Sequence, residues 1–185
     1  MNANASPSKD NPFTTGVRHL NESEEVAQPG HLSAEGCQVV ASVKHVNIGA
    51  VMLVEWDEGI AAYRSYTMFA YLRNGRWRET DRLSGGTAPN LDRFNRQQIS
   101  RGGVFEDGRH TDWVPVNGET LEMHCSEFWC NEQVVAFSTS TSIGELTGKT
   151  SSWGAGLVVY PAGESVTVRF YDAQHRVLES LKLEG

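Results

Sequence analysis

The sequence predicts an all-β protein: an antiparallel β-sandwich, with a barrel as the alternative and at most one or two short helices. First, its apolar residues mostly alternate with polar ones or form short runs of strand length. Second, Asn74-Gly75, Asp107-Gly108 and Asn117-Gly118 interrupt these segments, and such dipeptides are the strongest short-range signal for a β-hairpin. Third, long helical patterns are missing between the strands, which favours antiparallel pairing.

The individual strands follow from runs rich in valine and aromatic residues. We expect them at 37–46, 49–56, 63–72, 75–80, 121–130, 132–138, 156–160, 165–171 and 176–183. Pro115 has no N–H to donate, so its strand should lie at a sheet edge. Residues 88–100 are the one segment with a helical pattern, with Asn90 as its cap. Residues 138–152 contain nine Ser or Thr and predict a polar loop.

The chain divides into a polar N-terminal segment and one domain. Residues 1–35 lack hydrophobic periodicity and predict a flexible tail, with one short helical turn at 23–28. Residues 36–185 predict a single β-sandwich domain. We therefore expect deletion of residues 1–33 to leave the melting temperature nearly unchanged, since those residues offer little apolar surface to bury.

Composition points to a soluble globular protein of a reducing compartment. The chain has 185 residues, of which 39% are hydrophobic and 21% charged. No apolar run approaches the roughly 20 residues of a membrane span, and the N-terminus lacks the apolar segment of a secretory signal. Three cysteines cannot all pair internally. These observations predict a cytoplasmic location.

Charge is unevenly distributed along the chain. Between Arg64 and Arg109 there are nine arginines, no lysine and five acidic residues, hence a local net charge of +4 in a chain of −7. This asymmetry indicates that the middle segment meets something anionic. The overall acidity argues against general nucleic-acid binding, whereas association of identical copies stays open.

The segment "EMHCSEFWC" (122–130) holds two cysteines and a histidine, and it raises the question of a metal or redox site. On one strand Cys125 and Cys130 point to opposite faces, with their Cα atoms roughly 16 Å apart, too far for a disulfide. A turn at Ser126-Glu127 would be needed to assemble zinc ligands, and the bulky neighbours do not favour one. We interpret the segment as a buried strand, and we expect no structural metal and no cofactor.

Two other chemistries stay open as alternatives. A hydrolase or metal-dependent enzyme would be built from His110, Asp112, His124 and Glu127, if these side chains converge. A carbohydrate-binding sandwich would use exposed aromatic residues, for which Trp113, Trp129 and Trp153 are the candidates. "GELTGKT" (144–150) lacks one residue of the spacing of a phosphate loop, and a polar hairpin is the better interpretation.

The hairpin around Asn74-Gly75 carries the best candidate site. A two-residue turn pairs Arg73 with Arg76, Leu72 with Trp77, Tyr71 with Arg78 and Phe69 with Thr80. One face is then apolar and suited to the core: Tyr66, Met68, Ala70, Leu72 and Trp77. The other face carries the predicted binding residues, Phe69, Tyr71, Arg73, Arg76 and Arg78, followed by Arg82.

These observations favour a non-catalytic recognition or protein-interaction module over an enzyme. Arginines that face each other across a hairpin repel, so an anion or an acidic neighbour should offset that cost. The competing interpretation is that a second sheet covers Phe69 and Tyr71 and leaves the arginines as rim charges. The expected partner is another protein or an anionic ligand.

Overall fold

The computed structural model describes residues 11–87 and 96–185. Its elements are α1 (Pro12–Glu22), β1 (Cys37–His45), β2 (Ile48–Asp57), β3 (Ala62–Arg73), β4 (Arg76–Thr87), the 3₁₀ turn η1 (Arg96–Gln98), β5 (Val104–Val116), β6 (Glu119–Cys130), β7 (Ala136–Thr141), β8 (Gly144–Lys149), β9 (Ala155–Pro161), β10 (Val166–Tyr171) and β11 (Val177–Leu183). All pairings among the described strands are antiparallel. The predicted all-β class is confirmed.

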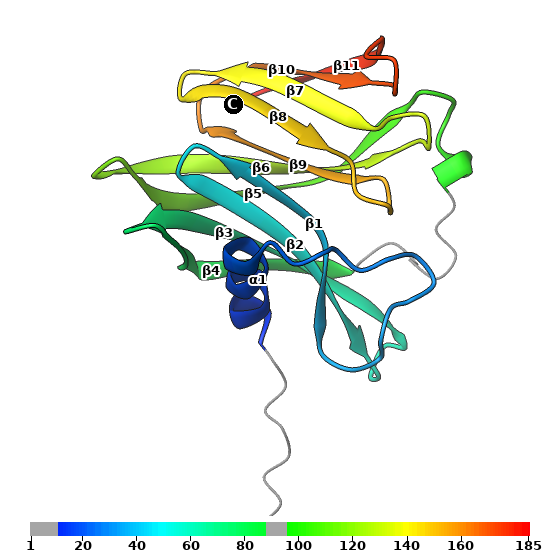
Figure 1. The fold of residues 1–185 in the computed structure, drawn as a ribbon, viewed down its shortest axis with the longest axis horizontal. Helices are drawn as coiled ribbons and strands as arrows, with labels where there is room; N and C mark the ends of the chain where they lie inside the picture. The colour runs from blue at the N-terminus through cyan, green and yellow to red at the C-terminus, as the bar shows by residue number, and fades with distance from the viewer. Residues whose placement is uncertain (1–10, 88–95) are drawn as a thin grey trace, which may run out of the picture.

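The strands form three sheets. One has the order β1-β2-β3-β4, a second β5-β6-β9 and a third β11-β10-β7-β8; we call them the N-terminal, central and C-terminal sheets. Figure 1 shows them stacked, with the central sheet between the other two and α1 on the outer face of the N-terminal sheet. In the described part of the chain none of the sheets closes on itself. The fold is therefore a sandwich of open sheets and not the barrel that the sequence left as the alternative.

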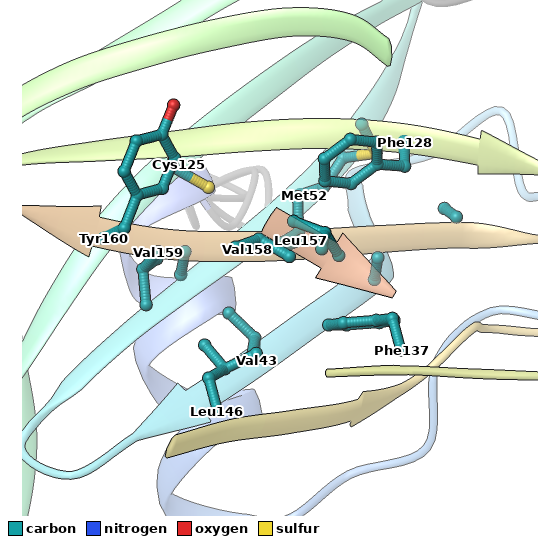
Figure 2. Close-up of a cluster of buried hydrophobic side chains, with 14 of the residues drawn as sticks. Val43, Met52, Cys125, Phe128, Phe137, Leu146, Leu157, Val158, Val159 and Tyr160 are labelled. Atoms are coloured by element: carbon teal, nitrogen blue, oxygen red, sulfur yellow. The ribbon is translucent and has the colours of Figure 1, made fainter. Parts of the chain in front are cut away.

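The position of the central sheet explains its sequence. A strand with a sheet on each side is mostly apolar on both faces. Residues 155–160 of β9 and 125–130 of β6 are buried without interruption, and Ser126 and Glu127 are the polar residues among them. β1 and β2 pack over β9, while β3 and β4 pack over β5. Figure 2 shows the core, where Val43 of β1 and Leu146 of β8 point toward one another. Phe128 meets Phe170 of β10 edge to face, with 5.3 Å between the ring centroids.

The two Asn-Gly hairpins are confirmed. Asn74 and Gly75 have φ of 51° and 73°, and Asn117 and Gly118 have φ of 52° and 88°, the left-handed values that a type I′ turn requires. Pro115 lies on β5, which is an edge strand of the central sheet, as predicted.

Several element predictions are wrong. Asp107-Gly108 is not a turn but lies within β5, at a register shift between Glu106 and Gly108. Residues 138–152 are not a loop, because most of them form the β7–β8 hairpin. Of the predicted helix at 88–100, residues 88–95 lie outside the described residues, and η1 at Arg96–Gln98 is a single 3₁₀ turn.

Helix α1 lies within the segment predicted to be a flexible tail. Asn11 caps it by accepting a hydrogen bond from the backbone N–H of Thr14 at 2.9 Å, and Pro12 opens its first turn. Leu20 is buried in a cluster with Val51, Met68, Trp77 and other residues of the N-terminal sheet. The helical turn predicted at 23–28 is wrong, since Ser23 is the left-handed C-cap and no helix follows it there.

The segment "EMHCSEFWC" is part of strand β6, as predicted. Cys125 and Cys130 are fully buried and free. Burial raises the pKa of the Cys125 thiol well above its ordinary value and that of Cys130 to about 12. Both thiols are therefore protonated at neutral pH and poor nucleophiles, which fits a place in the core.

Candidate functional site

The β3–β4 hairpin presents its arginines as the sequence predicts. Arg73 pairs with Arg76, Leu72 with Trp77 and Tyr71 with Arg78. Arg73, Arg76 and Arg78 are exposed, and none of them forms a salt bridge or side-chain hydrogen bond with a residue that the structure describes. We call these three the arginine tip. Two like charges therefore face each other across the strands, an arrangement that costs stability.

Other arginines of the basic segment are engaged inside the protein. Arg64 pairs with Asp57, and Arg109 donates to the carbonyl of Glu184 and lies near Glu106. Arg96 donates to the backbone carbonyls of Cys130, Asn131 and Val134 at 2.9–3.1 Å. Part of the positive charge of this segment is thus paired with acceptors inside the protein. The arginine tip has no such acceptor among the described residues.

Phe69 does not belong to an exposed face. It is 2% exposed and lies in the core between the N-terminal and central sheets. The predicted pairing of Phe69 with Thr80 is also wrong, because the ladder shifts register between Met68 and Ala70. Tyr71 is half-buried against the same core. The second sheet therefore covers these two aromatic residues fully and partly, respectively.

The opposite face of the hairpin is the apolar one, as predicted. Met68, Ala70 and Trp77 are buried there, with Tyr66 and Leu72 packed at the margin. Its cover is α1, a helix that the sequence analysis did not predict.

A polar cleft opens where β4 and β5 meet at the edges of the N-terminal and central sheets. It consists of two hollows that follow one another along these strands. Alternate residues of a strand point to the same side, as His110 and Asp112 do on β5 and Arg82 and Ser84 on β4. Asp112 and Arg82 line one hollow, and His110 and Ser84 line the next. The first, the acid–aromatic hollow, has a volume of about 280 Å³ and is lined by Tyr71, Glu79, Thr80, Asp81, Arg82, Asp112, Trp113 and Pro115. The second, the His110 hollow, has about 140 Å³ and is lined by Ser65, Thr67, Ser84, Gly85, Gly86, Asp107, Gly108, His110 and Glu127.

In the acid–aromatic hollow Asp112 is 5% exposed. Its Oδ1 accepts the backbone N–H of Trp113 at 2.8 Å and lies 3.8 Å from Nε of Arg82, whose side chain is 69% exposed. Its buried Oδ2 has no hydrogen-bond partner among the described residues. A buried carboxylate oxygen without a donor is costly, since its hydration is lost and not replaced.

In the His110 hollow a histidine and a carboxylate meet. Nε2 of His110 lies 2.7 Å from Oε1 of Glu127, which also accepts the hydroxyl of Thr67. Asp107 at the rim accepts the indole N–H of Trp129 at 3.1 Å. Because an ionised carboxylate oxygen only accepts hydrogen bonds, Nε2 is the ring nitrogen of His110 that donates in this pair.

The four residues of the enzyme alternative do not all converge. His110, Asp112 and Glu127 face the cleft, although Asp112 lines the other hollow. His124 lies on the opposite face of β6, bonded to Thr111 at 2.8 Å and beside Tyr160. Burial lowers the pKa of His124, and Arg109 lowers it further. Residues 11–87 and 96–185 contain no group of three or more His, Cys, Asp or Glu arranged to hold a metal ion.

The tryptophans of the carbohydrate alternative are not side by side at the surface. Trp129 and Trp153 are buried, and Trp113 is 53% exposed. Trp113 is therefore the one of the three that can contact a ligand, and it lines the acid–aromatic hollow.

The chain was compared with protein-family models, with curated proteins and with solved structures, and no significant match was found. Within the described residues no helix is long and apolar enough to span a membrane.

Proposed function

We propose that this protein is a non-catalytic recognition module and that the arginine tip binds an acidic surface of a partner protein. The observation that carries the proposal is the cross-strand pair Arg73–Arg76, which is exposed and lacks a described acidic partner. An anionic partner would attract both guanidinium groups and so offset their mutual repulsion. Phe69 is left out of the binding face because it is buried.

The contrast with the other arginines supports the proposal. Three other arginines donate hydrogen bonds to acceptors within the protein, namely Arg64, Arg96 and Arg109. We therefore assign them a structural role. The arginine tip stands at the end of the β3–β4 hairpin, and its three side chains are exposed to solvent. Guanidinium groups also suit carboxylates, which they bind with two parallel hydrogen bonds.

The test replaces Arg73, Arg76 and Arg78 together with glutamine. Surface substitutions of this kind should leave the free energy of unfolding within about 1 kcal/mol. The association rate with a labelled poly-glutamate peptide, measured by stopped-flow fluorescence, should fall, and it should depend less steeply on salt concentration. The matched control removes the same number of positive charges from the C-terminal sheet, by Lys149→Gln, Arg169→Gln and Lys182→Gln.

Equal rates for the triple variant and the parent protein would overturn the proposal. A triple variant that binds normally but unfolds at much lower urea concentration would instead assign the arginines a structural role.

A further inference from the structure

We propose that the acid–aromatic hollow is a binding site for an organic cation, namely the guanidinium group of an arginine side chain. The inference does not rest on the proposed function, since that concerns an anionic partner at the arginine tip. It begins from Asp112, a carboxylate inside a sandwich whose Oδ2 has no donor among the described residues. Such an oxygen calls for a hydrogen-bond donor, and a charged donor binds it most strongly.

Arg82 does not fill this role. Its Nε is 3.8 Å from Oδ1, which is an ion-pair distance but too long for a hydrogen bond, and most of its side chain is in solvent. At this distance, and with the guanidinium in solvent, Arg82 gains little from the pair. Arg82 is therefore a weakly held cation beside Asp112, which a better placed guanidinium can displace.

The electrostatic environment selects a cation. Three carboxylates line the hollow, those of Glu79, Asp81 and Asp112, against the single guanidinium of Arg82. The local charge is thus negative, in a protein with a formal net charge of −7. An anionic ligand would meet repulsion here, whereas a cation gains from the exposed acids at the rim and from the buried acid within.

The aromatic walls narrow the ligand class further. Tyr71 and Trp113 both line the hollow, and a planar guanidinium can stack on such rings while it hydrogen-bonds a carboxylate in its own plane. The volume of about 280 Å³ falls at the lower limit for clefts that hold drug-sized molecules, roughly 300–1,000 Å³. The hollow therefore fits one side chain rather than a nucleotide or another large cofactor.

The test uses N-acetyl-arginine amide as the probe and the indole N–H signal of Trp113 as the NMR readout, assigned with Trp113→Phe. The probe should shift this signal saturably, whereas the uncharged citrulline analogue should not. Asp112→Asn keeps the size of the side chain and the acceptor for the Trp113 N–H, and it should weaken binding about tenfold or more by removing the charged acceptor. Arg82→Gln removes the competing cation and should strengthen binding a few-fold.

The opposite signs of the two substitutions keep the inference testable even if Asp112→Asn folds poorly. The matched control is the exposed pair of Asp57 and Arg64, for which Asp57→Asn and Arg64→Gln should leave binding of the probe unchanged. The inference is overturned if no saturable shift occurs in the parent protein and in Arg82→Gln, if Asp112→Asn binds equally well, or if citrulline matches arginine.

Discussion

Glu127 is a carboxylate placed inside a sandwich of valines, phenylalanines and tryptophans. It is tolerated there because two donors satisfy it, the Nε2 of His110 at 2.7 Å and the hydroxyl of Thr67. These donors come from the central and the N-terminal sheet, respectively, so that the carboxylate joins the two layers. Most of the interface between the N-terminal and central sheets is stabilised by the burial of apolar side chains. Around Glu127, by contrast, it depends on hydrogen bonds.

We expect Glu127→Gln to destabilise the protein by about 1–3 kcal/mol. Both donors bind Oε1, so the glutamine oxygen can still accept them, but the two hydrogen bonds lose the charged acceptor that makes them strong. Urea denaturation measures the effect as a lower midpoint with an unchanged m-value. The control is Glu122→Gln, an exposed residue of the same strand, which should change little. A Glu127→Gln variant as stable as that control would show that the contacts do not link the sheets.

The contact between His110 and Glu127 was within reach of the sequence. A two-residue turn at Asn117-Gly118 sets the register in which His110 faces Cys125, and Glu127 is then a diagonal neighbour on the same face. The competing turn signal at Asp107-Gly108 obscured this, because a turn there would end the strand. The burial of Phe69 was not predictable in the same way, since it depends on which sheet covers the hairpin.

Helix α1 is an element that local sequence signals announce only weakly. Asn11 and Pro12 form an ordinary helix start, and Phe13, Val17 and Leu20 follow at helical spacing. The helix is short and contains Thr14, Thr15 and Gly16, so its intrinsic propensity is low and docking must stabilise it. Gly16 permits that docking, because a Cβ there would come 2.3 Å from Sδ of Met68.

Residues 1–33 include the docked helix α1, so we now expect their deletion to lower stability, contrary to the expectation from the sequence. Leu20 is 1% exposed, and Asn21 exchanges two hydrogen bonds with the backbone of Trp77, at 2.9 and 3.3 Å. Leu20→Ala should lower the free energy of unfolding by about 2–5 kcal/mol, the range for buried leucines in a core. Urea denaturation with Glu22→Ala as the exposed control measures this. A Leu20→Ala protein with the stability of the control would show that the helix is not docked in solution.

The β7–β8 hairpin shows why a Ser/Thr-rich segment can be mistaken for a loop. Phe137, Thr139 and Leu146 are the buried residues of these two strands, and they alternate with exposed or half-buried polar ones. Threonine suits strands, and two of the inward positions are apolar enough to reach the core. The strand β9 was predictable by contrast. It lies in the middle sheet and is buried on both faces, so its sequence is a continuous apolar run.

At the scale of the whole molecule, three stacked sheets and a helix bury basic groups as well as apolar ones. His19 is a buried residue of α1 with its Nε2 2.8 Å from the hydroxyl of Ser42, and its Nδ1 has no partner among the described residues. The buried Nε2 of His45, at the end of β1, also lacks a partner there. Burial lowers the pKa of both imidazoles; for His19, Glu24 opposes this effect and Lys44 adds to it.

The stability of the protein should therefore fall as the pH drops below 6.5, the ordinary value of these imidazoles. Above that pH both histidines are neutral in the folded and unfolded chains, and stability is at its full value. Below it the unfolded chain binds protons that the folded protein accepts only at lower pH, so that each proton favours unfolding. Urea midpoints measured between about pH 7.5 and pH 5.5 should decrease, and less steeply in the variant His19→Gln/His45→Gln than in the parent. Exposed His31→Gln is the control, and it should keep the parent's slope. If the double variant loses stability with pH as steeply as the parent, the two buried histidines are not its cause.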